Sequence, residues 1–134
     1  MKGENSLKIN TDCIRNILIT VESMDYGEEW IIDDLMNQLP SYSEAELQYH
    51  CLQLIDAGFL NASTIQSLNS PLQILRIKDL TYSGHQFLAD IRSDTTWNKT
   101  KEIAKSIGSE SLHALKDIAI SVVTSSIQNS LGLH

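Results

Sequence analysis

The chain has 134 residues, of which 42% are hydrophobic and 20% are charged. This length and composition predict one folded domain and exclude a disordered or collagen-like chain. The formal net charge is −7, and the stretch from Asn16 to Leu75 contains acidic residues but no Lys or Arg. The acidic residues of that stretch are Glu22, Asp25, Glu28, Glu29, Asp33, Asp34, Glu44, Glu46 and Asp56. Because affinity for nucleic acids is built largely from cationic contacts to phosphates, this distribution argues against DNA binding by that stretch.

The cysteines and the apolar runs bear on the cellular compartment. Cys13 and Cys51 are too few for a disulfide framework, and both lie in apolar-periodic stretches. We interpret them as reduced core thiols of a cytoplasmic protein. The first residues lack the apolar core of a signal peptide, and no run approaches the ~20 apolar residues of a membrane span. The sequence therefore predicts no association with a membrane.

The first half of the chain predicts three helices and a brief strand. Asn10 or Thr11 is expected to cap a first helix, whose apolar residues recur at three- and four-residue steps. Residues 30–31 read as a brief strand, and a short helix over 33–39 stops at Pro40. Ser43 followed by Glu46 matches the capping box, so a third helix is expected over 43–57, before Gly58.

The second half predicts a β-hairpin and then more helices. Residues 59–65 and 72–78 are apolar or β-branched runs, and the intervening QSLNSP has the composition of a turn. A helix face at Phe87, Leu88 and Ile91 follows Gly84. Residues 97–107 predict a charged helix that ends at Gly108, and Ser109 is expected to cap the last helix.

This order of elements is typical of a winged helix, a form of helix-turn-helix fold. We therefore expect a mostly α (α+β) fold: a winged-helix core with a two-stranded wing and a C-terminal helical extension. The predicted core spans residues 8–92 and the extension spans residues 93–134. The extension either belongs to the same single domain or serves as a dimerisation element. In this fold the helix over 43–57 occupies the recognition position.

Three stretches carry a resemblance to a known family. They are KINTDCIRNILITVE at 8–22, LQYHCLQLIDAGFL at 47–60 and DLTYSGHQFLADIRSDTTWNKTK at 79–101. Together they are similar to an uncharacterised domain-of-unknown-function family, number twenty-five thirteen in that series. The resemblance implies a winged-helix-like fold and a setting in bacterial phages or prophages. It implies no catalytic residues.

Catalytic and metal-binding patterns are absent from the sequence. There is no glycine-rich phosphate loop and no HExxH motif. His50 and His85 are interpreted as structural residues, with the His85 ring fixing the junction between hairpin and following helix. The sequence therefore predicts no enzyme, no catalytic residues, no metal site and no cofactor.

The exposed face of the helix over 43–57 is the predicted partner-binding surface. It carries carboxylates without cations, so we expect it to bind a basic surface of a protein partner. The candidate residues are Tyr42, Glu46, Tyr49, Gln53 and Asp56. The function expected from this surface is that of a non-enzymatic phage or prophage accessory protein with an inhibitory or regulatory role.

The alternative is a dimeric winged-helix transcriptional regulator that binds DNA. Arg76 and Lys78 lie one β-period apart on the wing and would face the same way. The candidate DNA-binding residues are Ser43, Tyr49, Gln53, Arg76 and Lys78. The negative charge of the recognition helix disfavours this hypothesis.

The end of the chain has an unusual composition. No residue from Ile118 to Leu133 is charged, and apolar residues alternate with Ser, Thr, Asn and Gln. Apolar groups on more than one helix face indicate burial on two sides. We therefore hypothesise a homodimer or partner interface here, with packing across the chain's own core as the alternative. The candidate interface residues are Leu115, Ile118, Val122, Ile127 and Leu131.

Overall fold

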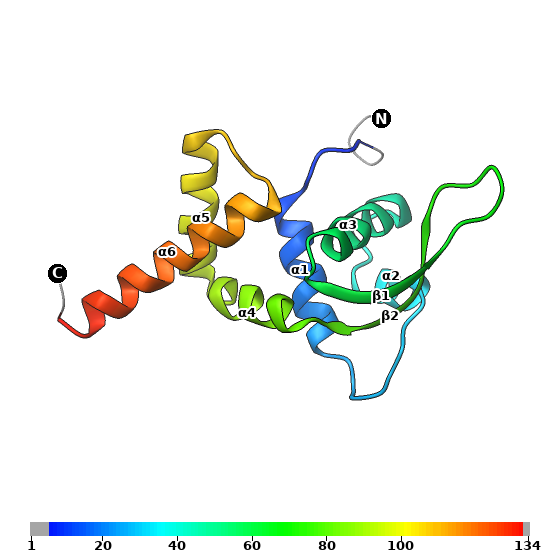
Figure 1. Ribbon diagram of the computed structural model, residues 1–134, viewed down its shortest axis with the longest axis horizontal. Coiled ribbons are helices and arrows are strands. Elements are labelled where there is room, and N and C mark those ends of the chain that lie inside the picture. Colours follow the sequence, from blue (N-terminus) through cyan, green and yellow to red (C-terminus); the bar gives the residue numbers. More distant parts are fainter. Residues whose placement is uncertain (1–5, 133–134) are drawn as a thin grey trace. The chain divides into compact units, whose positions relative to one another are not determined.

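Six helices and one two-stranded sheet form the part of the chain that the computed structural model describes, residues 6–132 (Figure 1). The elements are α1 (Thr11–Glu22), α2 (Ile32–Gln38), α3 (Glu44–Asp56), β1 (Leu60–Ile65), β2 (Gln73–Leu80), α4 (Tyr82–Ile91), α5 (Asp94–Ile107) and α6 (Leu112–Ser130). The predicted mostly α (α+β) fold with a two-stranded hairpin and C-terminal helices is confirmed. The hairpin of residues 60–80 is called the wing below.

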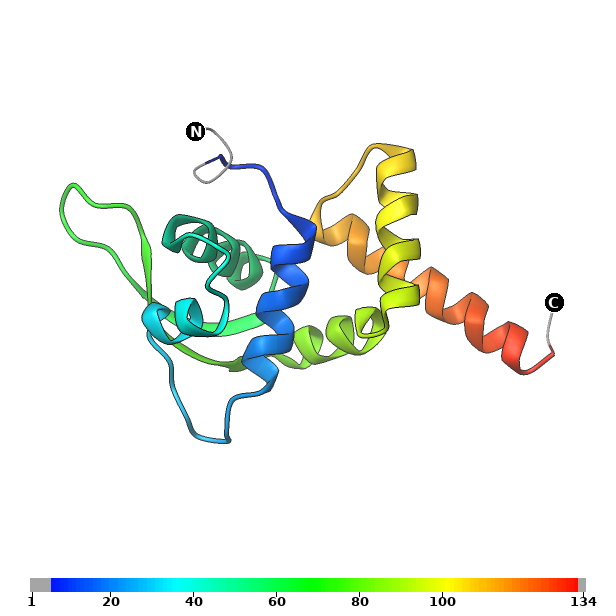
Figure 2. The ribbon, with the colours of Figure 1, turned by 180° about the vertical axis from the view of Figure 1, so that it is seen from behind.

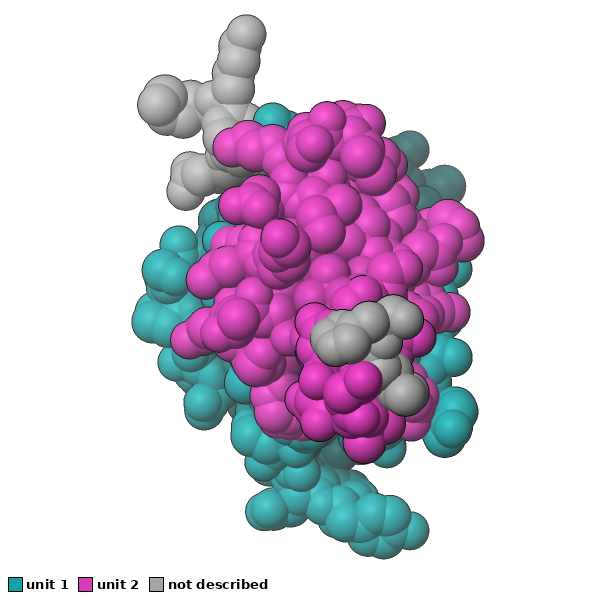
Figure 3. Space-filling view, turned by 90° about the vertical axis from the view of Figure 1, so that its left-hand side faces the viewer, with its two compact units in different colours: residues 1–85 teal, residues 86–134 magenta. Residues whose placement is uncertain are grey.

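The chain divides into two compact units, residues 1–85 and residues 86–134 (Figure 3). The division falls inside α4, whereas the boundary expected from the sequence lay after residue 92. The first unit contains α1, α2, α3 and the sheet. The second contains α5 and α6.

Side-chain caps define where the helices begin. Asn10 Oδ1 accepts from the Cys13 amide at 3.1 Å, which starts α1 at its predicted position. Ser43 and Glu46 form the predicted capping box of α3, since each side chain accepts from the other residue's amide at 3.1 Å. Two starts were predicted wrongly, because Ser93 caps α5 and Ser111, rather than Ser109, caps α6.

His50 joins α3 to the start of α1, which confirms its structural role. Its Nε2 atom accepts from the Asn10 amide at 2.8 Å. The Nδ1 atom therefore carries the ring proton and donates to the Glu46 carbonyl at 2.8 Å. The side chain is 2% exposed. It lies in a core to which α1 contributes Cys13, Ile14, Ile17, Leu18 and Val21, and α3 contributes Leu47, Cys51 and Leu54.

The antiparallel sheet is irregular. Its register shifts twice, between Asn61 and Ala62 and between Ser63 and Thr64. Because each shift inserts a residue into β2, the buried side chains of β2 recur every third position, at Ile74, Ile77 and Leu80. The strand expected at residues 30–31 is confirmed as a bridge from Trp30 to Ile77, with backbone hydrogen bonds of 2.9 and 2.7 Å. The loop after β1 extends beyond α3 in both ribbon views (Figures 1 and 2).

The second unit is a helical hairpin in which the C-terminal half of α6 has no buried residue. Gly108, at φ +75°, ends α5 in the left-handed conformation and turns the chain toward α6. The buried residues are Trp97, Thr100 and Ala104 of α5 and Leu112, Leu115 and Ala119 of α6. After Ala119 no described residue of α6 is buried, and this half of the helix runs past the N-terminal end of α5 (Figure 2).

The burial of α6 corrects the predicted interface at one residue. Leu115 is 0% exposed, so it belongs to the core of this chain and offers no surface to a partner. Ile118 and Val122 are half-buried, while Ile127 and Leu131 are exposed. Leu133, which closes the uncharged segment, lies outside the described residues.

Candidate functional site

A groove lies between the exposed side of α3 and the base of the wing. Its volume is about 460 Å³. One wall comes from α3, where the lining residues recur at i, i+3, i+4 and i+7 and therefore share one side of the helix. The other wall comes from the segment that enters β2. The lining residues are Glu44, Ala45, Gln48, Tyr49, Leu52, Pro71, Leu72 and Gln73.

Gln48 fixes the two walls to each other. Its Oε1 atom accepts from the Ile74 amide at 2.8 Å, so an α3 side chain completes the hydrogen bonding of the β2 backbone. Leu52 and Leu72 then contribute apolar surface to the lining, and Leu72 is 42% exposed. The result is an apolar hollow on an otherwise acidic surface, a combination suited to an apolar side chain of a partner.

Two of the residues predicted for the partner-binding face are engaged in local structure. The Glu46 carboxylate is held by the capping box. The Tyr42 hydroxyl accepts from Asn16 Nδ2 at 2.9 Å. Burial raises the pKa of Tyr42 above its ordinary value, and the hydrogen bond from Asn16 lowers it in part.

Of the other three residues predicted for the partner-binding face, only one lines the groove. Tyr49 is half-buried and lines the groove. Gln53 is half-buried and Asp56 is exposed, and neither of them lines it. The other lining residues of the groove were not predicted from the sequence; they are Glu44, Ala45, Gln48, Leu52, Pro71, Leu72 and Gln73. The helical spacing from Ala45 to Leu52 is the signal that could have revealed the α3 wall.

The residues proposed for DNA binding lie in different surroundings. Ser43 is held by the capping box. Arg76 and Lys78 are both exposed, on either side of the buried Ile77. Lys78 lines a second hollow of about 290 Å³ whose other titratable lining residues are Glu22, Asp25, Tyr26, Asp79 and His85. Three carboxylates around one ammonium group leave this hollow net negative, which repels phosphate.

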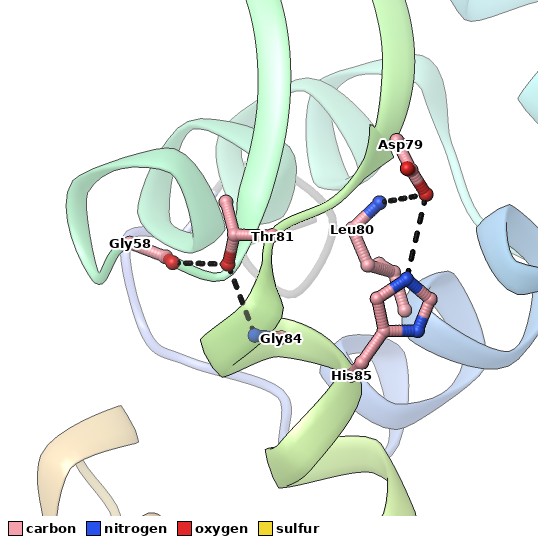
Figure 4. A network of polar contacts seen from close by, with 6 residues as sticks. All are labelled: Gly58, Asp79, Leu80, Thr81, Gly84 and His85. Atoms are coloured by element: carbon pink, nitrogen blue, oxygen red, sulfur yellow. Dashed lines mark hydrogen bonds and ion pairs between the residues drawn. The ribbon is translucent and has the colours of Figure 1, made fainter.

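The junction between β2 and α4 is held by polar contacts (Figure 4). Thr81 caps α4: its Oγ1 atom accepts from the Gly84 amide at 3.0 Å and donates to the Gly58 carbonyl at 2.5 Å. His85 Nε2 lies 3.6 Å from Asp79 Oδ1, which also accepts from the Leu80 amide at 2.7 Å. The His85 ring therefore contacts a carboxylate at the junction between the hairpin and α4, which is the junction that it was expected to fix.

The cysteines have no nucleophilic character. Both are buried and free. Burial raises the pKa of Cys13 to about 12, with a smaller contribution from the Glu46 carboxylate. Burial also raises the pKa of Cys51, which is 0% exposed. Both thiols are thus protonated at neutral pH, and the protonated form is a poor nucleophile.

Within residues 6–132, no group of three His, Cys, Asp or Glu side chains is placed to hold a metal ion. No helix within these residues has the length and apolar character needed to cross a membrane.

Comparisons with known proteins place the chain in a family. No solved structure matches it significantly. An "Uncharacterized protein" of Haemophilus influenzae (strain ATCC 51907 / DSM 11121 / KW20 / Rd) is 34% identical over 119 residues, which cover 88% of this chain and 97% of that protein. A family model described as "Hypothetical protein (DUF2513)" matches residues 8–110, a range that runs from before α1 to the loop before α6. The chain therefore belongs to the DUF2513 family.

Proposed function

We propose that this protein is a non-enzymatic accessory protein that binds a protein partner through the α3–wing groove. The observation that carries the proposal is the apolar groove within a stretch that has no cation. The groove residues lie between residues 44 and 73, and no Lys or Arg occurs from Asn16 to Leu75. A phosphate backbone is repelled by such a surface, whereas a basic protein surface is attracted to it.

The proposed partner segment combines an apolar side chain with flanking Lys or Arg residues. The apolar side chain would occupy the hollow between Leu52 and Leu72, and the flanking cations would lie near Glu44 and the exposed Asp56. The exposed side chains of Ile65 and Leu68 on the wing, 49% and 91% exposed, offer further apolar contact.

The proposed setting is the cytoplasm of a bacterial host, where the protein would act as an inhibitory or regulatory factor of a phage or prophage. This part rests on the family resemblance described above. A small acidic protein can inhibit a nucleic-acid-binding enzyme when its carboxylates occupy the phosphate-binding surface of that enzyme.

A selection from a library of random peptides tests the proposal. We expect the full chain to enrich peptides that carry a large apolar residue between basic residues, with binding that weakens as salt increases. Leu52→Glu places a charge in the groove and should reduce binding at least tenfold. Leu7→Glu is the matched control, because it makes the same change at a leucine that is 75% exposed and lines no part of the groove, and it should retain most of the binding.

Enrichment of acidic peptides, or equal binding by both variants, would contradict the proposed surface. Circular dichroism of each variant establishes that α3 is still folded.

The second candidate function is a dimeric winged-helix transcriptional regulator. It is favoured by the order of elements and by the exposure of Arg76 and Lys78 on β2. A mobility-shift assay at low salt, with random and genomic DNA, separates the two proposals. Tight binding of DNA that is lost when Arg76 and Lys78 are both changed to Ala would establish DNA binding, instead of protein binding, as the function.

A further inference from the structure

The half of α6 beyond Ala119 presents an apolar stripe that no described part of the chain buries. Its members recur at three- and four-residue steps and therefore share one side of the helix. They are Ile120, Val123, Ile127 and Leu131, the last of which is the C-cap residue. Ile120 is 44% exposed, Ile127 is 54% exposed and Leu131 is 69% exposed, while Val123 is half-buried. Water-exposed helices normally carry charged residues, yet none occurs from Ile118 to Leu131.

The stripe borders a hollow that can receive side chains. The hollow has a volume of about 290 Å³ and lies where the first turn of α5 meets α6. It is lined by Thr96, Val123, Ser126, Ile127, Ser130 and Leu131. Three of these residues belong to the stripe, and most of the others are small. An apolar side chain from a facing helix would therefore find a hole of the kind that receives knobs in helix pairs.

The distribution of charge indicates what covers the stripe. Residues 1–85 contain twelve acidic residues and five Lys or Arg, so they carry the whole net charge of −7. Residues 86–134 contain five of each and are neutral. A second copy of this chain would be repelled by the acidic unit but meets no net charge at the second unit. A strongly charged partner, in contrast, gains nothing from an uncharged stripe.

The spacing of the stripe also matches itself in reverse to within one residue. When two copies of α6 run antiparallel with a two-fold axis between Val123 and Ile127, Val123 faces Ile127 of the second copy. Ile120 then faces position 130 of the second copy, which is adjacent to that copy's Leu131. Each contact occurs twice, as a two-fold interface requires. We propose that a second copy of this chain covers the stripe in an antiparallel pair of α6 helices.

The first test is the mass of the full chain in solution, measured by light scattering over a range of concentrations. One copy has a mass of 15.0 kDa. We expect the mass to approach twice this value as concentration rises. Ile127→Glu should weaken the association at least tenfold, because two carboxylates would be buried near the axis. Gln128→Glu is the matched control, since it adds the same charge one residue away on another side of the helix, and it should dimerise normally.

The second test is cross-linking, which reports the direction of the helices. We expect a mixture of Val123→Cys and Ile127→Cys chains to form a disulfide between one copy of each variant. The native Cys13 and Cys51 are buried in the first unit and should remain unreacted. A parallel pair would instead cross-link each variant to itself.

Four results would overturn the proposal. The first three are a monomer at every concentration, cross-linking only between identical variants, and equal dimerisation of Ile127→Glu and the native chain. Binding of a monomer to neutral lipid vesicles through the same residues would assign the stripe to a membrane surface and would also overturn it. None of these results bears on the α3–wing groove, which lies in the other unit.

Discussion

Replacing Gly84 by Ala should destabilise the protein, although Ala is the better helix former. A Cβ atom at Gly84 would lie 2.0 Å from the Phe59 carbonyl oxygen and 2.9 Å from its carbon. Ordinary Cβ atoms do not approach another heavy atom within 3.0 Å, so α4 and the Phe59 backbone must separate by about 1 Å. Because the crowded atoms belong to the backbone, no side-chain rotation can relieve the overlap.

The expected cost can be worked out from the contacts at this junction. Crowding of a packed site costs about 1–3 kcal/mol. The separation would also weaken the bond from the Thr81 amide to the Phe59 carbonyl, now 3.1 Å, and the bond from Thr81 Oγ1 to Gly58. Each of these contributes about 1 kcal/mol. The gain in helix propensity offsets about 1 kcal/mol. The net loss of unfolding free energy is therefore about 2–4 kcal/mol.

Urea denaturation of the full chain, followed by circular dichroism, measures this loss. Ser83→Ala is the control, because it changes an exposed neighbour in the same turn of α4 and should alter the unfolding free energy by less than about 0.5 kcal/mol. A Gly84→Ala variant as stable as the native chain would show that the close approach at Phe59 is not a tight contact. The reasoning about this junction would then be refuted.

Three further predictions concern buried polar groups. Burial raises the pKa values of Cys13 and Cys51 above the ordinary 9.0, so the unfolded chain loses these protons first as the pH rises. The unfolding free energy should therefore fall as the pH rises above about 9, and a urea midpoint that stays constant to pH 11 would contradict this. His50→Phe leaves the Asn10 amide without its acceptor and should lower the unfolding free energy by about 1–3 kcal/mol in the same urea assay. An unchanged unfolding free energy would show that the hydrogen bond from Asn10 to His50 does not stabilise the fold. Thr100 Oγ1 is buried without a hydrogen-bond partner among the described residues, so Thr100→Val should raise the melting temperature, and a lower one would point to a partner for the hydroxyl.

Local signals in the sequence account for much of the fold. The capping box at Ser43 and Glu46 and the glycine at position 58 define α3 without reference to the rest of the chain. The apolar period of α1 is an equally local signal. These features could be predicted because each is stabilised by residues within a few positions of one another.

The features that sequence analysis missed depend on distant residues. The α3–wing groove exists because the Gln48 side chain bonds the Ile74 amide across 26 positions. The three-residue burial period of β2 comes from register shifts against β1, and no pattern within β2 alone specifies them. Leu115 was assigned to the interface because the apolar pattern of a helix does not show which of its sides is already covered by another helix of the same chain.

Because the two units differ in net charge, ionic strength should affect the binding of a partner by the first unit and the self-association of the second unit differently. Added salt screens the carboxylates of residues 1–85 and should loosen any cationic protein held there. The neutral apolar stripe of α6 loses nothing to screening, and salts such as sulfate strengthen apolar association. A single salt titration should therefore release the partner of one unit while the pairing of the other persists.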